Sequence, residues 1–264
     1  MKVGVFIGVD YGLDAVKEFL AKAMKLFDNV QWSFIGGSTV VNMPRISGEP
    51  DVVVVIGGDG SLLRFIHEYP EYISKPIIHV GAGRVNFLSE ILVTEGPHAL
   101  GNVFKGEYDI DERLMLGIYF GGKSFYALNE VVVKGIDPGR MMSVTVSEGD
   151  VELMSGRVDG VVVSTPTGST AYNLALGGPV VDYRVKSKVI TPIAPFSRTL
   201  IPIVHPYESP ITISSTEDFY VICDGFIKGK AKTITVGPWE GRVRLVRLRR
   251  VNMYERLRTR LLRP

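Results

Sequence analysis

The chain has 264 residues, which suits one large domain or two modest ones. Its composition, 45% apolar and 22% charged, is that of a globular protein, and no apolar run approaches the roughly 18 residues that cross a bilayer. The single cysteine, Cys223, excludes an intramolecular disulfide and fits a reducing compartment. The four histidines are scattered without metal-ligand spacing. We therefore expect a cytoplasmic protein with no membrane partner and no protein-built metal centre.

The charge is unevenly distributed. Residues 241–264 contain nine arginines and one acid, a net charge of +8, whereas the whole chain carries +2, which leaves −6 for residues 1–240. A basic segment of this kind can be a solvated strand and helix, can pack on an acidic surface of the same chain or of a sister subunit, or can bind nucleic acid. We favour packing, because Tyr254 is the segment's only aromatic residue. No nucleic-acid partner is expected.

Residues 1–105 alternate between strand and helix patterns. Apolar runs predict strands over residues 3–9, 30–35, 52–56 and 76–80. Residues 13–27 have apolar side chains at helical spacing, and a second helix is expected to begin near Ser61. The continuous run Val52–Ile56 is typical of a strand buried on both faces of a parallel sheet. These patterns predict a doubly wound, mostly parallel α/β domain over residues 1–105.

The pattern changes after Asp109. Short β segments separated by Gly, Pro or Asp turns are expected over residues 114–120, 124–133, 142–147, 160–164, 211–214, 219–223 and 233–236. One helix is expected over residues 170–176. We predict that residues 106–240 form a β-rich, sandwich-like domain of two packed sheets, and that residues 241–264 are a separate basic segment.

A glycine-rich turn follows the apolar run at residues 52–56. Three glycines, Gly57, Gly58 and Gly60, let backbone N–H groups approach a phosphate, and the amino end of a helix favours negative charge. Asp59 stands out in this setting, because a carboxylate repels a phosphate unless it takes a proton or holds a metal. A tight turn with a capping aspartate is the simpler alternative.

The segment Arg157–Asn173 contains the strongest ligand signal. A buried strand leads into Ser164-Thr165-Pro166-Thr167-Gly168-Ser169 and then into a short helix. A helix cap needs one hydroxyl, so the surplus hydroxyls, including that of Thr167, favour a ligand. Tyr172 adds a ring on which a base can stack. Asn129 and Glu130, set in an apolar strand, are a further candidate, because a buried carboxylate needs a partner.

Two nucleotide-binding patterns are interpreted as false matches. Gly117–Ser124 satisfies the phosphate-loop consensus, but the residues on both sides alternate as strands, which predicts a hairpin. Gly81-x-Gly83-x-x-Asn86 approaches the dinucleotide fingerprint, but Asn replaces its third glycine and no acid follows at the ribose-binding distance of about 20 residues.

Taken together, Gly57–Gly60, Asn129-Glu130 and Arg157–Asn173, in this order, resemble the NAD kinase family over most of the chain. The resemblance implies transfer of a phosphoryl group from ATP, or from inorganic polyphosphate, to the 2′-hydroxyl of the adenosine ribose of NAD. It also implies a divalent cation, usually Mg²⁺, and a homodimer or homotetramer. A kinase of another hydroxyl, on a lipid or a sugar, and a non-catalytic NAD(H)-binding sensor are the alternatives.

The resemblance also implies roles for individual residues. Asp59 matches the proposed general base, although a role linked to the metal, or both roles, stay open. The residue patterns and the resemblance together give the candidate substrate-binding residues, which are Gly57, Gly58, Gly60, Ser61, Arg84, Phe87, Asn129, Glu130, Arg157, Asp159, Thr167, Thr170, Ala171, Tyr172, Asn173 and Asp224. Asp159 matches a residue that can reach a neighbouring subunit's ligand.

This sequence departs from the family pattern at three places. Ser61 stands where Thr is usual, and Arg84 places a positive charge beside the expected phosphates. The stretch Ala194–Arg198 is shorter than its family counterpart and lacks the histidine. The choice between NAD and NADH is left open by this last difference.

Overall fold

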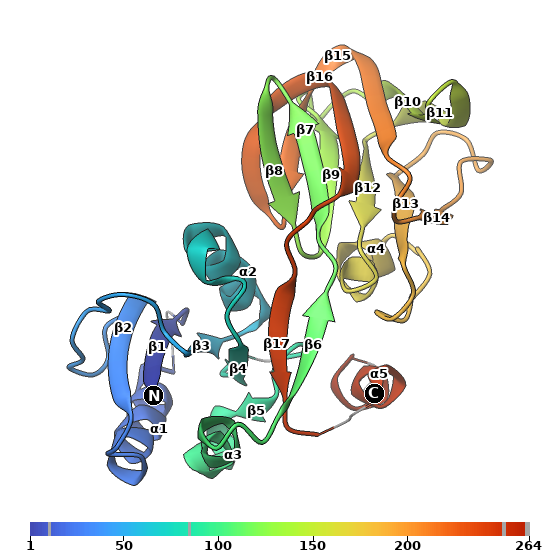
Figure 1. The fold of residues 1–264 in the computed structure, drawn as a ribbon. Helices are drawn as coiled ribbons and strands as arrows, with labels where there is room; N and C mark the ends of the chain where they lie inside the picture. The colour runs from blue at the N-terminus through green and yellow to red at the C-terminus, as the bar shows by residue number, and fades with distance from the viewer. Residues whose placement is uncertain (10–11, 84–85, 250–251, 262–264) are drawn as a thin grey trace. The chain divides into compact units, whose positions relative to one another are not determined.

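The computed structural model describes residues 1–9, 12–83, 86–249 and 252–261 (Figure 1). The chain divides into two compact units. The first unit combines Met1–Glu112 with Val243–Pro264, and the second comprises Arg113–Arg242.

The first unit is built on a largely parallel sheet. Its elements are β1 (Lys2–Ile7), α1 (Leu13–Leu26), β2 (Gln31–Gly37), β3 (Val52–Gly57), α2 (Asp59–Glu68), β4 (Ile77–Gly81), β5 (Ile91–Leu92), α3 (Leu100–Phe104), β6 (Asp109–Arg113), β17 (Val243–Arg247) and α5 (Met253–Arg256), with short 3₁₀ turns and a final π-helical turn, Leu257–Leu261. The strand order is β2-β1-β3-β4-β17-β6, and β5 pairs with β4. The pairs β1–β2, β1–β3 and β3–β4 are parallel.

Helices cover both faces of this sheet. Alternate residues of β1 point to opposite faces. Val5 packs in one apolar cluster with Leu20 of α1, whereas the ring of Phe6 lies 5.4 Å from that of Phe65 in α2. The doubly wound arrangement expected from the sequence is therefore confirmed.

Part of the basic carboxyl-terminal segment forms the strand β17. β17 pairs in parallel with β4 at Leu245 and Ile77 and lies between β4 and β6 in the strand order. The apolar side chains Val243, Leu245 and Val246 are buried, which accounts for the alternation of arginine with valine and leucine in this segment.

The second unit consists mainly of antiparallel strands. Its elements are β7 (Leu116–Phe120), β8 (Lys123–Ala127), β9 (Glu130–Gly135), β10 (Met142–Glu148), β11 (Val151–Val158), β12 (Gly160–Ser164), α4 (Tyr172–Ala175), β13 (Ser187–Ile193), β14 (Ile203–Pro206), β15 (Ile211–Cys223) and β16 (Phe226–Pro238). The strand order is β14-β13-β12-β9-β15-β16-β7-β8, with β10 between β15 and β11.

The two long strands β15 and β16 join the two halves of this sheet. They are paired and lie side by side in Figure 1. The first half of β15 pairs with β10 and the second half pairs with β9. Apolar residues of both halves share one core, which includes Val131 of β9, Val144 of β10 and Ile234 of β16. One continuous sheet thus folds over a common core. The β-rich unit is confirmed, but a single sheet stands in place of the two packed sheets expected.

Three local predictions were wrong. The expected strand over residues 124–133 is broken after Ala127, because the N–H groups of residues 128–130 bind a carboxylate instead of a neighbouring strand. The segments 211–214 and 219–223 are one strand with an irregular register between them. The helix expected over residues 170–176 is a 3₁₀ turn, Gly168–Thr170, followed by the short α4. Within the described ranges, no helix is long and apolar enough to cross a membrane.

Candidate active site

The glycine-rich turn lies at the carboxyl end of β3, at the start of α2. Gly57 has a φ of 151°, and a Cβ there would lie 2.2 Å from Oγ of Ser61. At Gly83, which follows β4, a Cβ would lie 3.0 Å from Cα of Gly58. Because both positions lack side chains, the turns after two neighbouring parallel strands approach each other closely. This is the edge of an α/β sheet at which ligands bind.

Asp59 is the first residue of α2, and both of its carboxylate oxygens are engaged by backbone groups. The N–H of Phe87 donates to Oδ2 at 2.8 Å, and the N–H of Leu88 donates to Oδ1 at 2.9 Å. The side chain is 26% exposed, so the carboxylate remains accessible. Two fixed donors hold the group in one orientation without removing it from solvent.

The other predicted residues of this unit have different surroundings. Gly60 has open space around its Cα, since a Cβ there would meet no atom within 4 Å. Ser61 is buried, and its hydroxyl donates to the carbonyl of Gly8 at 2.6 Å, so it links α2 to the end of β1. Phe87 is partly buried and touches the site through its backbone. Arg84 lies outside the described residues.

In the second unit, Asp224 clamps three consecutive N–H groups. Its carboxylate accepts from Leu128 at 2.7 Å, from Asn129 at 2.7 Å and from Glu130 at 3.1 Å. The N–H of Asp224 in turn donates to the carbonyl of Glu130 at 3.0 Å. Asp224 has a φ of 49°, a conformation that Asp tolerates better than most residues. These hydrogen bonds fix the interruption between β8 and β9 at which Asn129 and Glu130 lie.

Glu130 is a buried carboxyl group with an unsatisfied oxygen. The residue is 8% exposed, and no donor among the described residues lies within hydrogen-bond distance of Oε2. Burial, reinforced by the charge of Asp224, raises the pKa of Glu130 to about 8. A hydrogen bond from the backbone of Tyr172 opposes this shift. A carboxyl group that keeps its proton at neutral pH can donate a hydrogen bond to a ligand.

The hydroxyl-rich loop that follows β12 packs directly on this interruption between β8 and β9. The hydroxyl of Thr165 donates to the carbonyl of Leu128 at 2.6 Å and accepts from the N–H of Gly168 at 3.0 Å. A Cβ at Gly168 would lie 2.0 Å from the carbonyl oxygen of Asn129. Residues 129–130 and 165–172 therefore form one cluster with Asp224, as expected if they share a ligand.

Several predicted side chains in this loop form hydrogen bonds that fix its conformation. The amide of Asn173 donates to the carbonyls of Ser169 at 2.9 Å and Pro179 at 3.0 Å, and its oxygen accepts from Thr191 at 2.7 Å. The hydroxyl of Thr170 donates to the carbonyl of Thr167 at 3.3 Å. The partly buried Ala171 and the exposed ring of Tyr172 complete the helix start.

Arg157 and Asp159 are not brought to this cluster. Asp159 directly precedes β12, about five residues and roughly 17 Å along the strand from Ser164, and Arg157 lies at the end of β11. The guanidinium of Arg157 stacks on the exposed ring of Phe196 at 4.1 Å. Both residues are exposed.

The phosphate-loop pattern is a hairpin, as predicted. β7 and β8 are antiparallel partners, and Gly121 and Gly122 form the turn with φ values of 56° and 71°. Both angles are positive, as a two-residue hairpin turn of this hand requires.

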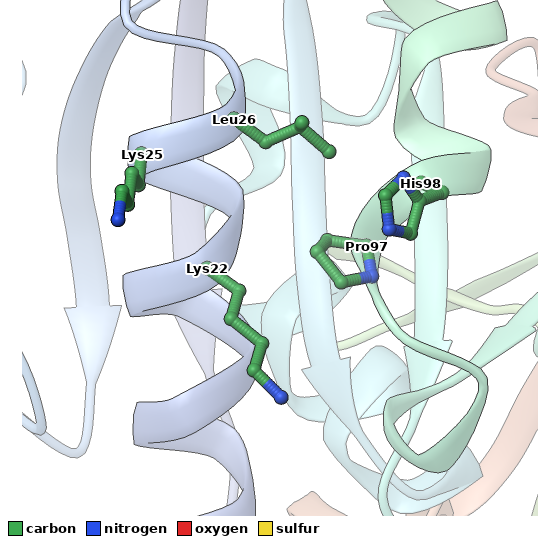
Figure 2. A pocket seen from close by; sticks show the side chains of 5 residues that line it. All are labelled: Lys22, Lys25, Leu26, Pro97 and His98. Carbon is green, nitrogen blue, oxygen red and sulfur yellow. The ribbon is translucent and has the colours of Figure 1, made fainter.

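A separate pocket of about 310 Å³ lies beside α1. Figure 2 shows Leu26 pointing towards Pro97 and His98, whereas Lys25 points to the other side of the helix. No residue predicted for the site lines this pocket.

Sequence reasoning missed His79. Its ring is buried behind the glycine-rich turn, with Nε2 3.0 Å from the carbonyl oxygen of Gly57 and Nδ1 4.0 Å from Oδ1 of Asp59. The signal that could have revealed it is a histidine in the otherwise apolar strand β4. This strand pairs in parallel with β3, which leads into the glycine-rich turn.

Two families match the chain. The ATP-NAD kinase N-terminal domain matches residues 19–108, and the ATP-NAD kinase C-terminal domain matches residues 128–236. The NAD kinase of Wolinella succinogenes is 34% identical over 238 residues, which are 85% of this chain and 81% of that protein. The NAD kinase of Geotalea daltonii is 35% identical over 82% of this chain and 80% of its own. The match to the NAD kinase of Methanothermobacter thermautotrophicus, at 37% identity, spans 62% of this chain and 58% of that protein.

Two solved structures share the fold. An NAD kinase from Archaeoglobus fulgidus in complex with ATP superposes with a TM-score of 0.79 at 24% identity, over 98% of both chains. Yeast NADH kinase complexed with NADH gives a TM-score of 0.84 at 19% identity, over 98% of this chain and 86% of that one.

The fold, the sequence matches and the two clusters of polar residues define a nucleotide-binding phosphotransferase. The chain belongs to the NAD kinase family, because both domain families of these enzymes match it and the relatives above exceed 30% identity over most of its length.

Proposed function

We propose that this chain transfers the terminal phosphoryl group of ATP, or of polyphosphate, to the 2′-hydroxyl of the adenosine ribose of NAD, with Asp59 as the general base. The observation that carries this proposal is the setting of Asp59. Its carboxylate is oriented by two N–H groups and stays accessible at the turn that follows β3. The hydroxyl oxygen attacks the phosphorus, its proton passes to Asp59, and the bond to the donor's bridging oxygen breaks.

The glycines around Asp59 are suited to the donor phosphates. Gly58 and Gly83 are partly exposed and Gly60 has open space around it, so the backbone is accessible at the ends of β3 and β4. The amino end of α2 also favours negative charge there. Phosphoryl transfer depends mainly on alignment and on neutralising charge, and a general base contributes roughly 10²–10⁴-fold.

In the second unit, Asn129, Glu130 and the Thr165–Tyr172 loop are the proposed NAD-binding residues. The proton that Glu130 retains gives it a donor for a ribose hydroxyl, and its unsatisfied oxygen gives it an acceptor. The exposed ring of Tyr172 offers a surface on which the adenine can stack. Asp224 supports these groups through the backbone.

Mg²⁺, or another divalent cation, is the proposed metal. Within the described part of the chain, no group of three or more His, Cys, Asp or Glu residues could hold a metal ion. Mg²⁺ is usually held by substrate phosphates with one or two carboxylates rather than by a protein cage. This pattern fits a cation bound on the donor phosphates, where it would neutralise their charge.

A homodimer or homotetramer in the cytoplasm completes the proposal. Arg157 in β11 and Asp159 just before β12 are separated from the Thr165–Tyr172 loop by the length of β12, which supports a role towards a neighbouring subunit's ligand. The single cysteine, Cys223, is free and buried, which fits a reducing compartment.

The test is an assay of purified protein with NAD and Mg²⁺, with either ATP or polyphosphate as the donor. We expect NADP with at least one donor, detected by an NADP-specific dehydrogenase. Absence of NADP with both donors would contradict the proposal. Replacing NAD by NADH in the same assay measures the acceptor preference. Light scattering of the protein as it elutes from a size-exclusion column measures the number of subunits in the oligomer.

A further inference from the structure

His79 lies in β4, paired in register with Val55 of β3, and its side chain is fully buried. A polar ring inside a strand that is covered on both faces loses its contacts with water, and this loss is unfavourable unless protein groups replace them. The surroundings of its two nitrogens therefore indicate what the ring does there.

The two ring nitrogens differ in their partners. Nε2 lies 3.0 Å from the carbonyl oxygen of Gly57, which can only accept, so Nε2 carries the proton in the neutral ring. Nδ1 is then an acceptor. No hydrogen-bond donor reaches Nδ1 among the described residues, and it lies 4.0 Å from Oδ1 of Asp59.

The ring stays neutral in this position. Burial lowers the pKa of His79, and the nearby guanidinium of Arg247 adds to this shift, whereas the charge of Asp59 and the backbone groups of Gly57 and Gly58 oppose it. Nδ1, an acceptor, therefore lies 4.0 Å from a carboxylate oxygen with which it cannot form a hydrogen bond while neither group carries a proton there.

We propose that His79 is a positioning residue for Asp59, and that its Nδ1 accepts a hydrogen bond from the Asp59 carboxyl group once that group has taken the proton of the substrate hydroxyl. The O–H bond of the substrate breaks, an O–H bond forms on Asp59, and the proton stays on Asp59. The 4.0 Å between Nδ1 and Oδ1 has to shorten by about 1 Å for this hydrogen bond to form. The inference rests on the proposed role of Asp59 as the base.

The surroundings of Asp59 then favour both of its states. The N–H groups of Phe87 and Leu88 stabilise the carboxylate before the reaction. The acceptor on His79 stabilises the protonated group afterwards. A base with both kinds of partner accepts a proton more readily than one with donors alone.

Two substitutions distinguish a positioning role of His79 from a role in packing alone. His79→Leu removes both hydrogen-bonding atoms, whereas His79→Gln retains an amide donor for Gly57 and an acceptor oxygen for Asp59. We expect His79→Leu to lower kcat about tenfold, with KM for NAD and ATP within about twofold, and His79→Gln to keep most of the activity. His205→Leu, which removes a buried histidine in the second unit, is the matched control and should leave kcat unchanged.

The same substitution in an Asp59→Asn background completes the test. If His79 acts through Asp59, His79→Leu should lower activity about tenfold in the wild-type protein and have no further effect in the Asp59→Asn variant. Equal losses in both backgrounds, or equal losses in the Leu and Gln variants, would overturn the inference. Thermal unfolding verifies the fold, and His79→Met replaces the Leu variant if that variant does not fold. Full activity of Asp59→Asn alone would instead remove the base assignment.

Discussion

The guanidinium group of Arg247 donates a hydrogen bond to the backbone carbonyl of Leu88 at 3.0 Å, across 159 residues of sequence. The N–H group of the same Leu88 donates to Asp59 at 2.9 Å. A residue of the basic carboxyl-terminal segment is thus two hydrogen bonds away from the proposed base. Arg256 adds a second bond to this stretch, at the carbonyl of Ser89.

Glu90 is the anion that these two arginines share, while Arg247 also pairs with Asp111 at 3.0 Å. Its carboxylate, 3% exposed, lies 3.2 Å from Arg247 and 2.5 Å from Arg256. We expect Glu90→Gln to lower the free energy of unfolding by about 3 kcal/mol, because two largely buried guanidinium groups lose a charged partner. Urea-induced unfolding measures this. Glu18→Gln, which breaks the exposed pair with Lys22, is the control and should cause no measurable change. Equal stabilities of the Glu90→Gln variant and the wild type would contradict the prediction.

Asp59→Asn tests the proposed base. We expect kcat to fall by about 10²–10⁴-fold while KM for NAD changes little, because the amide cannot take the proton. Steady-state kinetics measures both constants. Asp51→Asn, at an exposed aspartate of the same unit that accepts from the N–H of Lys2, is the control. Wild-type turnover in the Asp59→Asn variant would remove the assignment.

Asp224→Asn tests the clamp under the proposed NAD pocket. One carboxylate oxygen becomes an NH₂ group, which cannot accept from the backbone N–H groups of residues 128–130. We expect a loss of about 1–3 kcal/mol in the free energy of unfolding, together with a higher KM for NAD. Asp218→Asn, exposed on the same strand β15, should change neither quantity. A normal KM for NAD in the Asp224→Asn variant would show that the clamp does not support the pocket.

The pKa of Glu130, raised from 4.5 to about 8, predicts a pH dependence of stability. Between these values the native protein holds a proton that the unfolded chain has released, so the contribution of Glu130 to the free energy of unfolding falls as pH rises. Below about pH 4.5 both states hold the proton, and the contribution is constant.

Glu130→Gln removes this titration. We expect the stability of this variant relative to wild type to increase as pH rises from about 4.5 to 8. Urea unfolding of both proteins without NAD, at several pH values, measures the difference. A difference that stays constant with pH would show that the carboxyl group is not buried as described.

Lys123→Ala tests the interpretation of residues 117–124. In a true phosphate loop this lysine contacts the donor phosphates, and its loss would raise KM for ATP strongly. Lys123 is exposed at the start of β8, so we expect kcat and KM for ATP to remain unchanged. A large rise in KM for ATP would restore the phosphate-loop interpretation.

Local patterns predicted the main strands and helices of the first unit and the β-rich character of the second. The run at residues 52–56 and the helical spacing of residues 13–27 predict buried elements, because the period of apolar residues reflects the faces that each element buries. The glycine-rich turn with Asp59 was equally visible, since glycines at the end of a strand are a local signature. The break at residues 128–129 was not visible, because its cause is Asp224, about 95 residues further on.

The sequence by itself thus determined the doubly wound unit, the β-rich character of the second unit and the residues of the glycine-rich turn, but not β11, β13 and β14 of the second unit. Only the tertiary structure decided that β17 pairs with β4, that Arg247 reaches Leu88 and that His79 lies behind Asp59. These relationships join residues from different strands and loops. No local period encodes which strands become neighbours, and a buried polar group finds its partner only after the strands have paired.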